Sequence, residues 1–169
     1  MNNSASGLKI GTDGVLLGAW ADVGGGNHVW DVGCGTGLIA LMLAQRYDCH
    51  FSAIEIERDA ADEAEGNIGR SPWKERIKLI HGNISDVAAS LPAPDSIVSN
   101  PPYVTEMEKN EMDANVLEWE PGLALFVPDE DPLRFYNRIV RTLLHFSVES
   151  GLAHIHFRCQ FLHTEVRLA

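Results

Sequence analysis

The sequence is poor in cysteine and in positive charge, and it has no long hydrophobic run. Its three cysteines, Cys34, Cys49 and Cys159, follow no disulfide or ligand spacing, which excludes a disulfide framework and fits a reducing cytoplasm. No apolar stretch approaches the ~20 residues that a membrane helix needs, and the N-terminus lacks a charged and then apolar signal pattern. We therefore expect a cytoplasmic protein that makes no membrane contact.

Basic residues are outnumbered, with 13 Lys and Arg against 24 Asp and Glu, for a formal net charge of −11. The surface as a whole should therefore repel nucleic acid. Acidic residues are concentrated at positions 48–131, and arginines make the C-terminal part more basic. The length of 169 residues, without repeats or low-complexity tracts, predicts a single domain over 1–169, with 1–7 flexible.

The strongest pattern is a strand-like stretch over 29–32, apolar except for Asp31, then Gly33, Gly35 and Gly37, then apolar residues at helical spacing over 38–45. This predicts a strand, a tight loop that lets a ligand approach the backbone, and a helix. The spacing matches neither the dinucleotide fingerprint nor the P-loop. Asp31 would repel a pyrophosphate and attract an ammonium group, so the loop favours S-adenosylmethionine (SAM) over NAD. Cys34, inside the loop, is interpreted as a small filler and not as a nucleophile.

A second strand and helix follow, with Glu55 near the end of the strand over 51–56. An acidic residue at this place hydrogen-bonds the ribose hydroxyls in Rossmann-type folds. Glu55 is the candidate for this contact, with Glu57 as the alternate. Asn83 follows a third strand over 77–80 and is either an adenine contact or a turn residue. Thr12 and Asp13 precede an apolar helical segment, where they either cap the helix or contact the cofactor.

The fourth strand, over 97–99, leads into Asn100-Pro101-Pro102-Tyr103. Each proline holds the residue before it extended, which keeps the oxygens of Asn100 and Pro101 out of a helix. These two oxygens can accept both hydrogens of a planar NH2 group, and Tyr103 can stack on its plane. Because ligands bind at the carboxyl ends of parallel strands, this turn and the glycine loop should share one crevice.

These motifs give the chain a resemblance to two families. Residues 31–37 together with Asn100-Pro101-Pro102-Tyr103 resemble SAM-dependent N-methyltransferases that act on amide or adenine nitrogens. Residues 8–100 resemble bacterial valine-tRNA adenine methyltransferases, through 9–20 and through Ser71-Pro72-Trp73 before Arg76. Residues 100–145 resemble release-factor glutamine methyltransferases, through the catalytic turn and residues 120–126.

The resemblance implies a Rossmann-like class I methyltransferase fold, an α/β fold with a mostly parallel twisted sheet and helices on both faces. Both families end the sheet with an antiparallel hairpin, for which this chain looks too short, so we expect that hairpin to be missing. A fifth strand is predicted over 152–158 and a helix start over 161–169. The resemblance assigns catalysis to Asn100, Pro101 and Tyr103. It assigns cofactor binding to a larger set: Thr12, Asp13, Asp31, Gly33, Gly35, Gly37, Glu55, Asn83 and Asn100.

The substrate alternatives are a glutamine of a release factor, an adenine of tRNA, or no turnover in a SAM-binding fragment. The acidic stretch over 104–120 slightly favours the glutamine, because it would repel RNA at the mouth of the crevice. We expect no metal site, since no carboxylate or cysteine pair completes a ligand set around His154, His156 and His163.

Overall fold

The structure is a computed structural model that describes residues 11–102, 104, 105, 107, 126–141, 154–159 and 162–167. For 104, 105, 154–159 and 162–167 it describes the backbone course and strand pairing only. The positions of Tyr103 and of residues 1–10 lie outside the described part.

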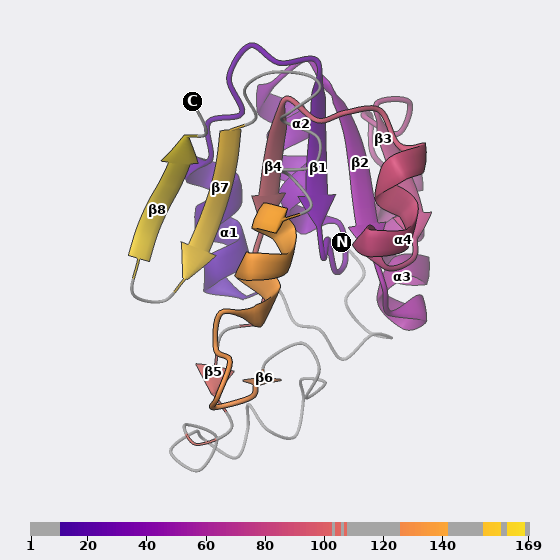
Figure 1. Ribbon diagram of the computed structural model, residues 1–169. Helices are drawn as coiled ribbons and strands as arrows, with labels where there is room; N and C mark the ends of the chain where they lie inside the picture. The colour runs from indigo at the N-terminus through magenta and orange to yellow at the C-terminus, as the bar shows by residue number, and fades with distance from the viewer. Residues whose placement is uncertain are drawn as a thin grey trace.

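A six-stranded sheet in the order β3-β2-β1-β4-β7-β8 forms the centre of the fold (Figure 1). Its strands are β1 (His28–Val32), β2 (His50–Glu55), β3 (Ile77–His81), β4 (Ser96–Ser99), β7 (His154–Cys159) and β8 (Leu162–Arg167). The pairs from β3 to β7 are all parallel. Their carboxyl ends therefore lie along one edge, the lower edge in Figure 1. The order reverses between β1 and β4, which creates the crevice where doubly wound sheets bind ligands.

Helices cover both faces of this sheet. The helices are α1 (Thr12–Trp20), α2 (Leu38–Arg46), α3 (Arg58–Gly69), α4 (Ile84–Val87), the 3-10 turn η1 (Ala88–Ser90) and a helix over 134–141. One core cluster joins α1, α2 and α3 to the sheet through buried residues such as Leu17, Leu43 and Phe51. The other joins α4, η1 and the helix over 134–141 to Trp30 and Ile97. Successive strand residues supply opposite faces, as Val29 and Trp30 do, which explains the unbroken apolar runs in the sequence.

Two expectations for the C-terminus are wrong. Residues 162–167 form β8, which pairs antiparallel with β7 from Cys159↔Leu162 to His154↔Arg167. The described sheet therefore does end in an antiparallel hairpin, and 162–167 form a strand where a helix start over 161–169 was predicted. The physical reason is the alternation of Leu162, Thr164 and Val166 with polar residues, which is the period of a strand and not of a helix.

A short second sheet follows the turn at Asn100, Pro101 and Pro102. Strands β5 (Val104–Thr105) and β6 (Phe126–Val127) pair in parallel beyond the lower end of β4 (Figure 1). The Met107 N–H donates to Asp129 Oδ1 at 2.8 Å, which adds a bond just past this pair. The backbone just after Pro102 is thus paired with the segment that leads into the helix over 134–141.

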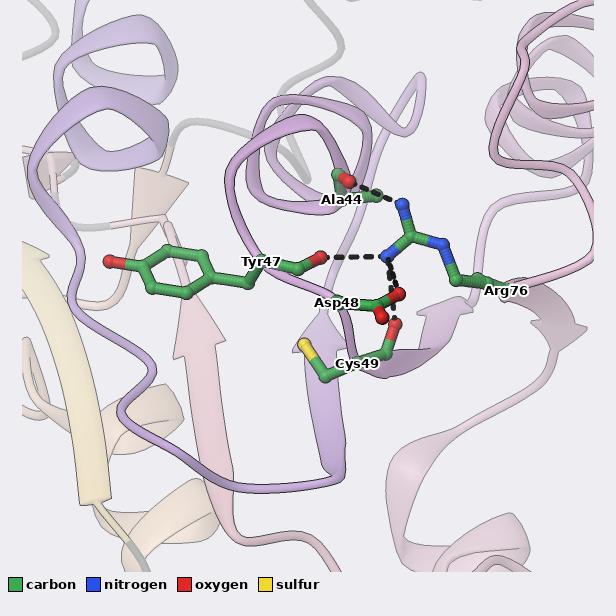
Figure 2. Close-up of polar contacts among 5 residues, drawn as sticks. All are labelled: Ala44, Tyr47, Asp48, Cys49 and Arg76. Carbon is green, nitrogen blue, oxygen red and sulfur yellow. Dashed lines mark hydrogen bonds and ion pairs between the residues drawn. The ribbon is translucent and has the colours of Figure 1, made fainter.

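The amino ends of the strands form the opposite edge of the sheet, and Arg76 organises it. Its guanidinium donates to the carbonyl oxygens of Ala44 at 2.6 Å and Tyr47 at 2.7 Å, and more weakly to that of Cys49 at 3.3 Å (Figure 2). Asp48, 3.6 Å away, completes an exposed ion pair. The carbonyls of Ala44 and Tyr47 lie at the C-terminal end of α2, where helix carbonyls lack partners within the helix, so Arg76 caps α2 from the start of β3. This amino-end edge supports the fold and lies opposite the carboxyl-end edge, which is called the ligand edge below because doubly wound sheets bind ligands there.

Candidate active site

The glycine loop lies between β1 and α2 at the carboxyl-end edge. Gly33, Gly35 and Gly37 have φ values of 71°, 55° and 81°, a region that side chains rarely tolerate. The N–H groups of Gly33 and Cys34 donate to the Ile54 carbonyl oxygen at 2.9 and 3.0 Å. The three glycines are therefore required by the backbone path itself, which wraps tightly from β1 towards the end of β2.

Cys34 is buried within this loop, and burial is the main cause that raises the pKa of its thiol well above its usual value. The nearby carboxylates Asp31 and Glu55 raise it further. A thiol held protonated in this way is a poor nucleophile. Its interpretation as a filler fits this environment.

Asp31 is fully buried on β1, one residue before the strand ends. Its Oδ2 accepts a hydrogen bond from the Ala40 N–H of α2 at 2.9 Å, while its Oδ1 is buried without a partner among the described residues. Burial raises the pKa of Asp31 to about 7, the Ala40 bond offsets part of this rise, and the charge of Glu55 adds to it. A buried carboxyl oxygen without a donor is costly, and a cationic donor would relieve that cost.

Glu55 ends β2 beside the same loop and is buried. Its Oε2 accepts from the Gly35 N–H at 2.8 Å, and its Oε1 accepts from the N–H groups of Ile56 and Glu57 at 2.8 and 2.9 Å. The carboxylate is thus held in place by three backbone donors and keeps lone pairs for further ones. Glu57, the alternate candidate, is the N-cap residue of α3 and is exposed.

Asn100 and Pro101 follow β4, next to β1 in the sheet. The side-chain oxygen of Asn100 is buried and has no hydrogen-bond partner within the described structure. Pro101 is buried as well. The structure therefore brings Asn100 to the same edge as Asp31, the glycine loop and Glu55, on three neighbouring strands. The stacking role assigned to Tyr103 falls outside the described residues.

The remaining candidates are Thr12, Asp13 and Asn83, which lie at or near the starts of α1 and α4. The N-cap of α1 is Gly11, so Thr12 and Asp13 lie inside the first turn and neither caps the helix, contrary to one of the two interpretations. The Asn83 Oδ1 accepts from the Ser85 N–H at 3.0 Å and caps α4. Asn83 is thus the turn residue that the sequence offered as one alternative. Cofactor contacts by Thr12, Asp13 and Asn83 stay predictions.

Sequence reasoning missed Ile56. Its side chain is 57% exposed directly after Glu55, at the ligand edge. An exposed isoleucine beside a carboxylate that could hold a ribose offers an apolar surface for a purine ring. The signal that could have identified it is an apolar residue, Ile56, directly after the last buried residue of the strand, Glu55.

No group of three or more His, Cys, Asp or Glu side chains that could hold a metal occurs among the side chains described. His154, His156 and His163 are not part of that set. Within the described helices, none has the length and apolar character that crossing a membrane requires.

Residues 4–118 match the family model described as Methyltransferase small domain. The tRNA1(Val) (adenine(37)-N6)-methyltransferase of Phocaeicola vulgatus is 48% identical over 104 residues, which cover 60% of this chain and 43% of that protein. The protein of the same name from Enterobacter sp. (strain 638) is 35% identical over 161 residues, which cover 92% of this chain and 58% of that protein. The chain thus spans less than two thirds of these curated relatives.

Among solved structures, cofactor-bound Rv0187 from MTB aligns with a TM-score of 0.55 at 13% identity, over 89% of this chain and 58% of that one. The hMettl16 catalytic domain aligns with a TM-score of 0.57 at 16% identity, over 79% and 51%. At such identity the likeness concerns the fold alone. It is the Rossmann-like class I methyltransferase fold that the sequence predicted.

Proposed function

The chain belongs to the Methyltransferase small domain family, and from this membership we propose that it is a SAM-dependent N-methyltransferase acting on the NH2 group of an adenine in tRNA. The observation that carries the proposal is a pair of buried acceptor oxygens without donors among the described residues, Asp31 Oδ1 and Asn100 Oδ1. They lie at the carboxyl-end edge on neighbouring strands. Buried acceptors are nearly always satisfied, so two at one ligand edge indicate donors supplied by ligands.

The residues present fit the cofactor. Asp31 would bind the ammonium group, and the field of that cation would favour the charged carboxylate that burial disfavours. Glu55 would accept from the ribose hydroxyls, and Ile56 would pack against the adenine ring. When bound, SAM supplies an activated methyl group on a sulfonium.

The Asn100 side chain and the Pro101 carbonyl would hold the substrate nitrogen. The lone pair of an adenine NH2 is delocalised into the ring, which makes the nitrogen a poor nucleophile. Two acceptors that bind its hydrogens stabilise the tetrahedral nitrogen formed during transfer and fix the direction of its lone pair. The proton can leave after the transfer, so Asn100 is needed as an acceptor and not as a base.

Adenine is preferred over glutamine because the relatives above carry the tRNA adenine name over the matched region. The slight preference for glutamine depended on the acidic stretch over 104–120, of which the structure describes only 104, 105 and 107. That preference has no support from the comparisons. The third alternative, a SAM-binding unit without turnover, is tested below.

Calorimetric titration with SAM, followed by transfer of a labelled methyl group, tests the proposal. Unmodified tRNA and release factor are offered in parallel. We expect SAM binding and label in tRNA adenine. Label in release factor alone would contradict the choice of substrate, and SAM binding without label in either would support the unit without turnover.

Asn100→Ala then tests the acceptor role. It should abolish transfer and leave the SAM dissociation constant within about twofold, because Asn100 binds the substrate nitrogen. Asn27→Ala is the matched control, since Asn27 is exposed at the amino-end edge. An Asn100→Ala variant of unchanged rate would refute the assigned role.

A further inference from the structure

The helix over 134–141 has two different sides. Tyr136, Ile139 and Val140 face the core cluster around Trp30, and Ile139 is buried. Arg134, Arg138 and Arg141 are exposed, at spacings of four and three residues. Residues at these spacings share one side of a helix. We call these three residues the arginine stripe.

The arginine stripe lies near the ligand edge. The Arg138 Nε donates to Ser85 Oγ at 2.8 Å, and Ser85 is on α4, which directly follows the carboxyl end of β3. The same helix packs in one cluster with Val32, the residue before Gly33. Figure 1 shows this helix in orange in front of the lower part of β4. In the same view, α4 lies farther to the right, past β1.

Charge and length decide what the stripe could bind. Guanidinium groups stay charged at all relevant pH values and bind phosphate through paired N–H donors. The seven steps from Arg134 to Arg141 span about 10 Å along the helix. The stripe therefore presents its guanidinium groups over a length that reaches more than one phosphate of a nucleic-acid backbone.

Acidic side chains near the arginine stripe reduce its attraction for phosphate. Asp129, Glu130 and Asp131 precede the helix, and Asp86 lies on α4. The first three lie at the N-terminal end of the helix, where the dipole favours them. Physiological salt screens charges beyond ~8 Å, so the acids farther away on this chain, which has a net charge of −11, have little effect on a local basic row.

We propose that the arginine stripe contacts the sugar-phosphate backbone of the RNA substrate and holds it at the rim of the active site. The inference rests on the proposed function, because it names how the same substrate is bound. It would explain how a chain with a net charge of −11 binds RNA.

The test uses the full chain and a fluorescent, unmodified tRNA transcript. Arg134→Gln/Arg141→Gln removes two charges and retains Arg138, which bonds to Ser85. Arg70→Gln/Lys74→Gln is the matched control, because both residues are exposed where the chain passes from α3 to β3, at the amino-end edge. Binding is measured by anisotropy between about 50 and 200 mM salt, and SAM binding by calorimetry.

We expect the stripe variant to bind tRNA roughly tenfold more weakly, with the slope of log K against log salt reduced by about 1.8. The control should stay within about twofold of the wild type, and SAM affinity should not change in either variant. Equal tRNA binding by the stripe variant and the wild type, or equal loss in the control, would overturn the inference.

The two proposals fail in different ways. If the wild-type chain methylates tRNA and the stripe variant does so with unchanged KM, the inference fails and the proposed function stands. If the wild-type chain binds SAM and neither binds nor methylates tRNA, both fail. If a release factor binds the wild-type chain and loses affinity for the stripe variant, the stripe binds a protein and not RNA, and the inference is overturned.

Discussion

The Ser99 hydroxyl donates a hydrogen bond of 2.7 Å to the backbone carbonyl oxygen of Val32, and both atoms belong to a fully enclosed part of the core. Val32 is the residue before Gly33, and Ser99 is the residue before Asn100. The ladder between β1 and β4 ends at Asp31↔Val98. This side-chain bond therefore extends the pairing by one residue and joins the start of the glycine loop to the turn that begins at Asn100.

Ser99→Ala should loosen that junction. We expect a loss of about 1–2 kcal/mol in the free energy of unfolding, because a buried hydrogen bond is removed. Methyl transfer should fall more than SAM affinity does, since Asn100 follows Ser99 directly. Urea unfolding and initial rates measure the two effects. Ser90→Ala is the control, because Ser90 makes a bond of the same 2.7 Å to Val87 at an exposed site; equal losses in both variants would show that burial of the Ser99 bond is unimportant.

Asp31→Asn should change how stability depends on pH. The folded pKa of Asp31 is raised from 3.8 to about 7, so the folded state binds more protons than the unfolded state between these values. The free energy of unfolding therefore falls as pH rises through this window, by at most about 1.4 kcal/mol for each pH unit. The asparagine side chain of the variant stays neutral and still accepts from the Ala40 N–H, so this fall should be absent from the variant.

The wild-type curve also contains His28, whose pKa is lowered mainly by burial and which acts in the opposite direction below 6.5. The difference between the wild-type and Asp31→Asn curves isolates Asp31. A difference that does not change between about pH 4 and 7 would refute the raised pKa. SAM affinity of the wild type should rise as Asp31 loses its proton and fall once the ligand's own ammonium does so, near pH ~8.

Those features of the candidate site that depend on local backbone geometry could be predicted from the sequence. The tight loop at Gly33, Gly35 and Gly37 was predictable because left-handed positions favour glycine, and the place of Glu55 at the end of β2 followed from the strand pattern. Contacts across the fold left no trace in the sequence. The bond from Ala40 to Asp31, and the one from Ser99 to Val32 over 67 residues, exist only once α2 and β4 have packed.

Local alternatives were also decided by context. Gly11, and not Thr12 or Asp13, caps α1, because the first helical hydrogen bond closes from Val15 to Gly11. The spacing of the arginine stripe is visible in the sequence, but its exposed side follows only from the packing of Ile139 on Trp30's cluster. The strand β8 depended on β7 as a partner, which a helix-biased interpretation of 161–169 overlooked.

Arg76→Lys should destabilise the fold without affecting the ligand edge. Lysine keeps the charge but cannot supply the fork that spans the carbonyls of Ala44 and Tyr47. We expect a loss of roughly 2–3 kcal/mol in unfolding free energy, with SAM affinity of the folded protein unchanged. Arg70→Lys, which alters one exposed arginine with a bond to Asn67, should cost little. An Arg76→Lys variant as stable as the wild type would show that the cap on α2 is dispensable.

Gly26→Ala should be among the most damaging small substitutions at the amino-end edge. A Cβ built on Gly26 would clash with the Asp95 Cβ, and neither atom belongs to a flexible chain end. Asp95 cannot move aside freely, because its Oδ2 accepts from the N–H groups of Asn27 and His28 at 2.7 and 3.0 Å. The backbone must shift instead, and those two bonds weaken with it. We expect a loss of about 2–4 kcal/mol, measured by urea unfolding.

Gly25→Ala is the control for that substitution. Gly25 is the neighbouring residue, a Cβ there meets nothing within 4 Å, and its φ is not in the left-handed region. Alanine at this position restricts the unfolded chain, so stability should stay equal or rise by about 0.4–1 kcal/mol. Opposite signs at two adjacent glycines would show that contact with Asp95, and not loss of chain flexibility, sets the cost. A Gly26→Ala variant as stable as Gly25→Ala would mean that β1 and the turn at Asp95 can separate without loss, and that the bonds from Asn27 and His28 do not hold this edge together.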